Sequence, residues 1–367
     1  MFSTRKNLEN FIQNKKFKKI FILTGKKSYI LSGAKNIFKN LLKSKIIYFY
    51  YKTSPYPEIK ELKKIIISLR KFSPDLIMAI GGGSVLDYAK MANAIEIKED
   101  LEKKIINYNY PIKRRLTKLV AIPTTAGSGA EVTSNAVIYV NKTKYSIESE
   151  LIKPNYFFLI PELVIKNPKK LKSSSGFDAI AQAVESMLSR KSNLQSIHFA
   201  KKSLKISLKY YLNYLKKPNI DNSSAMCLAA NLSGKAISIS KTTAPHAVSY
   251  PFTSLYNLSH GHAVSLTLEK FLKFNFMNIQ HSSCKFNLAN RYKSIFKLFN
   301  VKNIIELENF IKVIKNKAGL ESDFNILKIN LNNNIDKILD GVNLNRLNNN
   351  PVTLNKKDIK NILIKFN

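Results

Sequence analysis

The chain has little cysteine and no long apolar run, and each absence excludes a class of protein. Its two cysteines, Cys227 and Cys284, are too few for a disulfide framework and lack the spacing of a metal site. No uninterrupted apolar run approaches the roughly 20 residues that span a bilayer. The first residues also lack the apolar core of a secretory signal. We therefore expect a reducing, cytoplasmic setting and no membrane partner.

Acidic side chains are also scarce. The 367 residues include 24 Asp and Glu against 60 Lys and Arg, a formal net charge of +36. Such an excess is typical of proteins that bind polyanions. The lysines are nevertheless spread over the whole chain beside many asparagines and isoleucines, which indicates a genome rich in A and T. We expect no specific nucleic-acid partner, although a non-catalytic polyanion-binding protein remains a remote alternative.

Two domains are predicted from the hydrophobic pattern. Short β-branched segments alternate with helical patterns up to about residue 160, which predicts a parallel sheet with crossover helices. The strands are expected at 19–25, 46–50, 76–80 and 119–123. Helices are expected at 178–188, 193–215, 225–239, 263–274 and 304–318, and surface loop or weak helix at 330–350. The prediction is an α/β dinucleotide-binding domain over 1–162 and an all-α domain over 163–367.

Glycine is uncommon, with 12 residues in all, yet three of them are consecutive. Gly81, Gly82 and Gly83 stand between a predicted strand and a predicted helix. Without Cβ atoms the backbone N–H groups can approach a pyrophosphate, and the helix N-terminus adds its dipole. The run is not a GxGxxG fingerprint, and tight packing alone would also explain it. With the glycines, Ser84 and Asp87 are candidate cofactor-binding residues.

A second loop rich in small residues follows the next predicted strand. Thr124, Thr125 and Ser128 lie in the run PTTAGSGAEVT and suit the phosphates and the nicotinamide side of a dinucleotide. The same residues also fit a capped helix, with Ser128 as the N-cap and Glu131 completing a capping box. Both interpretations can hold together.

One carboxylate and two imidazoles form the candidate metal site. Three of the five histidines, His246, His260 and His262, fall in one short segment, and Asp178 precedes them. A lone histidine is more often structural than a ligand. A set of one Asp and two His, however, is the kind that binds a divalent transition metal and leaves a position open for substrate.

Taken in order, these motifs resemble the iron-containing (group III) family of metal-dependent alcohol dehydrogenases. GGGSVLDYAK, PTTAGSGAEVT, GFDAIAQAVES and HAVSYP…HGHA carry the resemblance, which spans roughly residues 19–275. It implies a nucleotide-binding domain, a helical domain and hydride transfer assisted by Fe²⁺ or Zn²⁺. It also matches Asp178, His246 and His260 to three of the family's metal ligands.

The chain departs from the family pattern at two positions. Gln182 stands where the usual fourth ligand is a histidine, and a glutamine carbonyl is a weaker donor than imidazole. We expect Gln182 as a possible fourth ligand. Tyr250 stands where many members carry a histidine near the nicotinamide. The proton donor is therefore open, with His262 and Tyr250 as candidates.

The residues around the first histidine of the segment narrow the expected substrate. The run ISKTTAPH followed by HGHAV resembles the branch that reduces phosphonoacetaldehyde to 2-hydroxyethylphosphonate. Lys241, Thr242 and Thr243 precede a ligand by about one turn and would hold a small anionic aldehyde. A solvated surface lysine is the alternative for Lys241. Other small aldehydes, alcohols or polyols, and a cyclising lyase such as dehydroquinate synthase, remain open as alternatives.

The cofactor is expected to be NADPH or NADH. After the first strand many relatives place an aspartate that binds the adenosine ribose, whereas this chain has Gly25 followed by Lys26 and Lys27. The absence of the aspartate and the presence of two lysines favour binding of a 2′-phosphate, and hence of NADPH. Lys144 matches a family position near the cofactor. A homodimer is left open.

Overall fold

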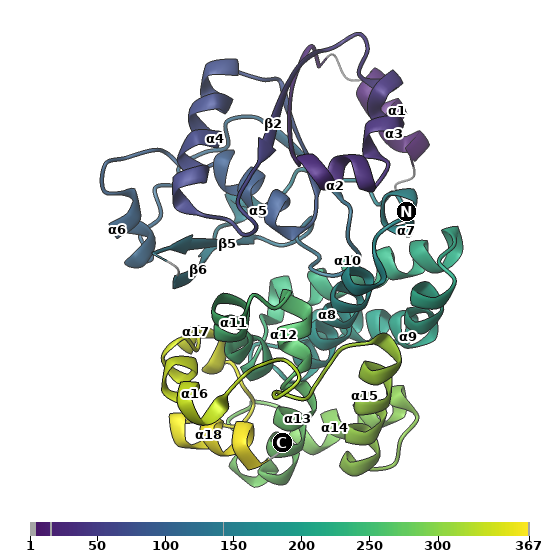
Figure 1. The fold of residues 1–367 in the computed structure, drawn as a ribbon, viewed down its shortest axis with the longest axis vertical. Helices are drawn as coiled ribbons and strands as arrows, with labels where there is room; N and C mark the ends of the chain where they lie inside the picture. The colour runs from purple at the N-terminus through teal and green to yellow at the C-terminus, as the bar shows by residue number, and fades with distance from the viewer. Residues whose placement is uncertain (1–4, 15–16, 142, 366–367) are drawn as a thin grey trace. The chain divides into compact units, whose positions relative to one another are not determined.

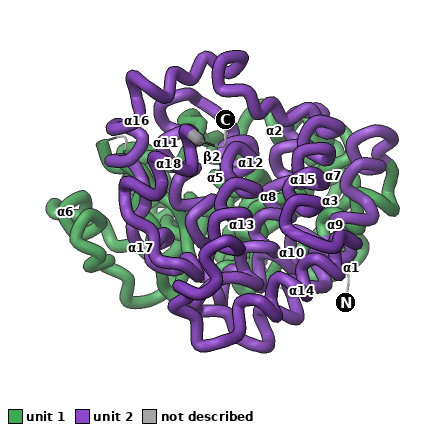
Figure 2. The backbone as a smooth tube through the Cα atoms, turned by 90° about the horizontal axis from the view of Figure 1, so that it is seen from below, with its two compact units in different colours: residues 1–167, 219–227 green, residues 168–218, 228–367 purple. Residues whose placement is uncertain are grey.

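The computed structural model describes residues 5–14, 17–141 and 143–365. It divides into two compact units, Met1–Asn167 with Asn219–Cys227, and Pro168–Pro218 with Leu228–Asn367 (Figure 2). The division falls a few residues after the predicted boundary at 162/163, because the short helix α7 (Glu162–Ile165) packs with the first unit. The helix predicted at 225–239 is α10 (Ile220–Ser240). Its first residues belong to the first unit, which the sequence pattern did not predict.

The first unit is built on a parallel sheet, as predicted (Figure 1). Its strand order is β2-β1-β3-β4-β7. The bounds are β1 (Lys19–Gly25), β2 (Ile46–Lys52), β3 (Leu76–Gly81), β4 (Lys118–Pro123) and β7 (Tyr156–Phe157). A separate antiparallel pair is formed by β5 (Asn135–Val140) and β6 (Thr143–Glu148). The helices are α1 (Arg5–Asn14), α2 (Lys26–Leu31), α3 (Ala34–Leu41), α4 (Ile59–Phe72), α5 (Gly83–Ala92) and α6 (Leu101–Ile106), with a 3₁₀ turn at Glu150–Ile152.

Both faces of this sheet are covered, which explains the continuous apolar composition of its central strands. All six residues of β3 are buried. Because side chains alternate along a strand, Ile77 and Ala79 enter the core formed with α4 and α5. Met78 and Ile80 enter the core formed with α1, α2 and α3. The glycine triplet therefore leaves the carboxyl end of a fully buried strand.

The second unit is helical, as predicted. Its elements are α8 (Lys169–Leu188), α9 (Leu194–Lys216), the rest of α10, α11 (Ala244–Tyr256), α12 (His260–Ser265), α13 (Leu268–Met277), a 3₁₀ turn (Ile279–His281), α14 (Leu288–Phe299), α15 (Ile304–Ala318), α16 (Leu331–Asp340), α17 (Leu344–Leu347) and α18 (Lys356–Lys365). Helix α8 packs on α9 and α12, and nearly all of its residues after Leu171 are buried. The described helices include none that is long and apolar enough to cross a membrane.

Two helical predictions need correction. The single helix expected at 263–274 is broken, because Thr267 has non-helical backbone angles and begins α13. Helix α11 was not predicted, since Pro245 and Pro251 are normally helix-breaking signals. Pro245 lies in the first turn, where no intrahelical N–H bond is lost.

The asparagine-rich stretch 330–350 was expected to be surface loop or weak helix. It forms helices α16 and α17, but its apolar side chains are buried, so the expected surface placement is wrong. Its apolar residues recur at helical spacing, and Ile335, Ile338 and Leu347 join a core that includes Ala247 and Phe252 of α11. Asparagines serve as N-caps of α16 and α17 through side-chain oxygens. Despite its many asparagines, this stretch forms the amphipathic helix α16, which packs against α11, the helix that carries His246.

Truncating this hidden core should therefore destabilise the second unit. Ile338 is fully buried, and Ile338→Ala is expected to lower the free energy of unfolding by about 2–5 kcal/mol. Leu344→Ala is the matched control because Leu344 is 62% exposed, and it should change stability by less than about 0.5 kcal/mol. Urea unfolding followed by circular dichroism measures both. Equal effects of the two substitutions would contradict the buried placement.

Candidate functional site

Three predicted metal ligands converge in the second unit. Asp178 lies on α8, His246 in the first turn of α11 and His260 at the start of α12. One ligand atom of each lies within 4.8 Å of the others. The Nε2 atom of His246 is 3.2 Å from Oδ1 of Asp178, and the two histidine rings are 5.2 Å apart between centroids. One carboxylate and two imidazoles fit a first-row divalent metal with open coordination positions.

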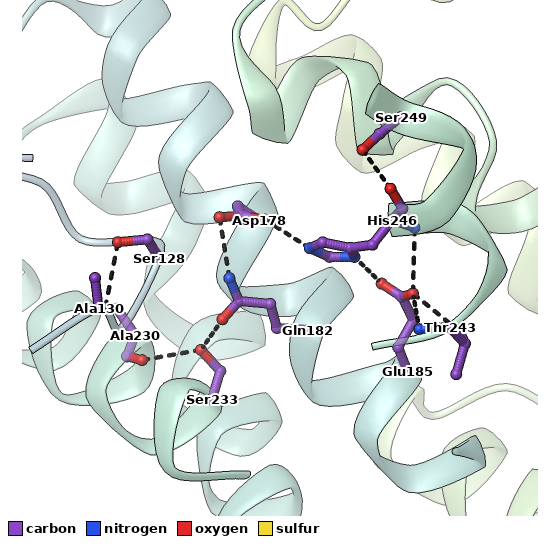
Figure 3. Close-up of polar contacts among 10 residues, drawn as sticks. All are labelled: Ser128, Ala130, Asp178, Gln182, Glu185, Ala230, Ser233, Thr243, His246 and Ser249. Carbon is purple, nitrogen blue, oxygen red and sulfur yellow. Dashed lines mark hydrogen bonds and ion pairs between the residues drawn. The ribbon is translucent and has the colours of Figure 1, made fainter. Parts of the chain in front are cut away.

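A fourth residue, Glu185, contacts His246 on the side of its ring opposite Asp178 (Figure 3). Its Oε2 contacts Nδ1 of His246, which leaves Nε2 of the same ring directed at Asp178. Its Oε1 accepts from the backbone N–H and the hydroxyl of Thr243, both at 2.9 Å. Sequence reasoning missed Glu185. The available signal was its position two helical turns after Asp178, which places both carboxylates on one face of α8.

The buried charges of these groups shift their protonation. Burial opposes a charged His246, but the Glu185 carboxylate and the bond to Asp178 outweigh it and raise the pKa of His246 from 6.5 to about 9. Burial likewise opposes a charged Asp178, but the bond from His246 and the charge of His260 hold the pKa of that carboxyl below its ordinary value. Asp178 is therefore a carboxylate anion, the form that can bind a metal.

Gln182 is held by hydrogen bonds to Asp178 and Ser233, and its role as a possible fourth ligand stays a prediction. Its amide nitrogen donates to Oδ2 of Asp178 at 3.0 Å, and its carbonyl oxygen lies 3.0 Å from the hydroxyl of Ser233 (Figure 3). A carboxylate only accepts hydrogen bonds, so the amide nitrogen must face it. The only ligating atom of Gln182 is thereby turned to Ser233, and the amide instead orients Asp178.

The two candidate proton donors differ in their surroundings. The ring of Tyr250 lies 6.2 Å from that of His260 between centroids. His262, by contrast, is bound through Nε2 to the carbonyl oxygen of Glu321 at 2.8 Å. Burial lowers the pKa of His262, so the neutral ring donates to that carbonyl. This contact does not support His262 as a donor to substrate, whereas Tyr250 stays a prediction.

The predicted anion-binding residues precede α11. Lys241 is half-buried and has a left-handed backbone with φ of 60°. Thr242 is buried. Thr243 gives both its N–H and its hydroxyl to Glu185. These bonds do not support a contact with substrate, which stays a prediction for Thr243. Lys241 is left as the charged candidate in this turn.

In the first unit the two predicted cofactor loops lie side by side. The N–H of Thr124 donates to the carbonyl of Gly81 at 3.0 Å. A Cβ atom on Gly83 would come 3.1 Å from Oγ of Ser128, and one on Gly82 would touch Thr125. The hydroxyl of Ser84 is buried at the start of α5 without a hydrogen-bond partner among the described residues. An orphaned donor beside glycines at a helix N-terminus fits a phosphate group.

The capped-helix interpretation of the second loop is wrong. Residues 124–134 form bends and turns with no helix, and the Ser128 hydroxyl accepts a 3.4 Å bond from the N–H of Ala130. The loop is held instead by Lys90, which is fully buried on α5. Its ammonium group donates to the carbonyl of Ala130 at 3.0 Å and the hydroxyl of Thr133 at 2.8 Å. Helix α5 thus carries one loop and anchors the other.

The remaining cofactor candidates occupy the same unit. Asp87 accepts a 3.0 Å bond from the N–H of Val137. Burial raises the pKa of Asp87, and the charges of Lys90 and Lys144 oppose this rise. Lys144 therefore lies near Asp87 in space. Gly25 ends β1 and precedes α2, and a Cβ there would come 2.8 Å from Oγ of Ser28. These contacts leave the cofactor roles of Gly25, Asp87 and Lys144 as predictions.

The approach of α12 to α8 requires a glycine at position 261. A Cβ there would overlap the carbonyl oxygen of Ser174 and come 2.9 Å from Cβ of Asp178. We expect Gly261→Ala to push His260 away from Asp178 and to abolish metal retention after desalting, as measured by inductively coupled plasma mass spectrometry. Dinucleotide binding should survive, because its loops belong to the other unit.

The control for this substitution is Ser259→Ala. It removes only a hydroxyl contact with Ser174 and should keep the metal. Wild-type metal content in Gly261→Ala would show that the close approach is not required.

The raised pKa of His246 gives a pH-dependent stability in the metal-free protein. The folded pKa lies above the unfolded value, so its stabilising contribution is complete below about pH 6.5 and is lost as the pH rises through about 9. We expect the Tm of chelated protein to fall across that window. Glu185→Gln removes the main charge that raises the pKa of His246, so the Tm of this variant should fall less across the same window. Parallel Tm profiles for the two proteins would contradict the assignment.

Comparison with known proteins agrees with this arrangement. Residues 3–161 match the family described as iron-containing alcohol dehydrogenase, and residues 172–366 match the C-terminal part of the same family. The sulfoacetaldehyde reductase of Bifidobacterium kashiwanohense, solved with NAD⁺, is similar with a TM-score of 0.85 at 24% identity, covering 99% of this chain and 96% of that one. At that identity the likeness shows the fold.

Curated relatives are similar over shorter stretches. Phosphonoacetaldehyde reductase of Streptomyces viridochromogenes is 30% identical over 220 residues, which is 56% of this chain and 55% of the relative. Aldehyde-alcohol dehydrogenase 2 of Entamoeba histolytica is 27% identical over 280 residues, 71% of this chain and 32% of the relative. The chain thus spans about a third to about half of the length of these relatives.

Proposed function

We propose that this chain, which belongs to the iron-containing alcohol dehydrogenase family, is a metal-dependent NAD(P)H oxidoreductase that reduces phosphonoacetaldehyde to 2-hydroxyethylphosphonate. The observation that carries the redox assignment is the convergence of Asp178, His246 and His260 within 4.8 Å. Three ligands leave coordination positions open for a carbonyl oxygen.

An anionic substrate is supported by three independent features. Lys241 lies in the turn that leads directly into α11, whose first turn carries His246. The net charge of +36 creates a field that draws anions. The similarity at 30% identity to a phosphonoacetaldehyde reductase points to the same class of two-carbon aldehyde with an anionic head group. Lys241 would bind that head group by a charge-assisted hydrogen bond.

Residues of this chain divide the chemistry between them. When bound, a divalent metal polarises the aldehyde oxygen and a reduced nicotinamide supplies the hydride. Asp178, His246 and His260 hold the metal, while Glu185 fixes the ring that faces it. Tyr250, near His260, donates the proton that completes the alcohol.

Cofactor binding is assigned to the first unit. Gly81, Gly82, Gly83 and Ser84 hold the pyrophosphate at the start of α5, and Thr124, Thr125 and Ser128 orient the nicotinamide side. NADPH is favoured over NADH because Lys26 and Lys27 directly follow β1. Their charges would attract a 2′-phosphate, whereas an acidic residue at this place would repel it. Fe²⁺ and Zn²⁺ both suit the donor set. Two cysteines without a disulfide support a cytoplasmic location.

The test is NADH or NADPH oxidation by chelated protein resupplied with Fe²⁺ or Zn²⁺, comparing phosphonoacetaldehyde with the neutral aldehyde butanal. Lys241→Met keeps the chain length and removes the charge. We expect it to raise KM for phosphonoacetaldehyde by about 10- to 100-fold, the equivalent of one charged hydrogen bond, and to leave butanal unchanged. Lys205→Met, at an exposed position of α9, is the control and should change neither.

Two results would overturn parts of this proposal. Absence of turnover with every metal and cofactor would remove the redox function. A Lys241→Met variant that alters both aldehydes alike would remove the head-group role of Lys241 and favour a neutral aldehyde or alcohol as substrate.

A further inference from the structure

The turn of residues 240–243, which joins α10 to α11, has a backbone that its own sequence does not favour. Lys241 has φ of 60°, a left-handed conformation that glycine and asparagine adopt readily and that a lysine adopts at a cost. Asn257 and Asn300 occupy the equivalent position after α11 and α14. A lysine held in this conformation requires support from elsewhere in the fold.

That support comes from Asn349, more than a hundred residues later. Its side-chain nitrogen lies 2.8 Å from the carbonyl oxygen of Ser240 and 3.0 Å from that of Thr242, the two residues that flank Lys241. Its side-chain oxygen accepts a 3.2 Å bond from the N–H of Lys191. Carbonyls accept and N–H groups donate, so the orientation of this amide is fixed by its neighbours.

The end of α8 holds the same turn from a second side. The hydroxyl of Ser189 donates to the carbonyl of Ser240 at 2.5 Å and lies 2.7 Å from the nitrogen of Asn349. Thr243 is bound to Glu185. Asn349 and Ser189 are 3% and 0% exposed, so water cannot replace these bonds and the turn is held in one conformation.

We propose that Asn349 is a positioning residue that fixes the turn of residues 240–243 and thereby sets the preference for aldehydes carrying an anionic group. The inference rests on the head-group role proposed for Lys241. A charge-assisted hydrogen bond depends strongly on geometry, so the direction of the lysine side chain matters. That direction is determined by the backbone of Lys241, and Asn349 binds the carbonyl on each side of it.

The chain provides a matched control in the adjacent residue. Asn350 is an equally buried asparagine, but its side-chain nitrogen donates to Oδ1 of Asn275 and to the carbonyl of Val352 and has no bond to the turn. Asn349→Ala and Asn350→Ala therefore remove the same kind of group from the same segment. Only the first removes support from Lys241.

The experiment compares the full-length, metal-loaded variants by two measurements. Amide hydrogen exchange across residues 240–243 reports the order of the turn directly. The ratio of KM for phosphonoacetaldehyde to KM for butanal reports selectivity. We expect Asn349→Ala to speed exchange in the turn and to raise the ratio about tenfold, near the effect of one hydrogen bond, with metal content unchanged. Asn350→Ala should do neither.

Each alternative result has a separate meaning. If Lys241→Met changes the ratio and Asn349→Ala does not, the positioning role is wrong while the proposed function stands. Equal changes from Asn349→Ala and Asn350→Ala indicate general destabilisation and overturn the inference. If Lys241→Met leaves the ratio unchanged, the head-group role fails and this inference fails with it. Should Asn349→Ala not fold, Ser189→Ala removes the neighbouring support and carries the same expectations.

Discussion

The second unit depends on a row of buried charges that must satisfy one another. Glu185, His246 and Asp178 are each at most 4% exposed and lie in contact in that order. A buried carboxylate or imidazolium is costly unless it is paired and hydrogen-bonded. The row therefore fixes α11 against α8, and the same contact directs Nε2 of His246 toward Asp178, within the candidate metal site. Structural stability and ligand geometry have one physical cause here.

Close packing of α12 on α8 at Gly261 places His260 beside Asp178 and His246. Helix α12 reaches α8 where Gly261 meets the carbonyl of Ser174, and a larger side chain would hold His260 away. Asn349 then connects the C-terminal segment to the turn before α11. Residues from four separate parts of the chain thus determine where the three candidate ligands and Lys241 lie.

In the first unit, too, glycines allow two segments of backbone to approach closely. The glycine triplet lets the loop after β4 approach the start of α5, and Lys90 ties that loop to the same helix. A fully buried ammonium that donates to a carbonyl and a hydroxyl is compensated locally. One helix thereby sets the spacing of both loops, and the buried Ser84 hydroxyl lies in its first turn.

The sequence by itself indicated strands β1 to β4, helices α8, α9, α10 and α15, the glycine triplet, and Asp178, His246 and His260 as candidate metal ligands. The strands and helices follow from short-range periodicity, and the candidate ligands follow from side-chain chemistry together with the resemblance to a known family. Tertiary structure decided the rest: that Gln182 faces Ser233, that His262 binds a carbonyl, that Glu185 orients His246, and that an asparagine-rich stretch is core. The reason is that a polar side chain has several possible partners, and only the folded neighbours select among them.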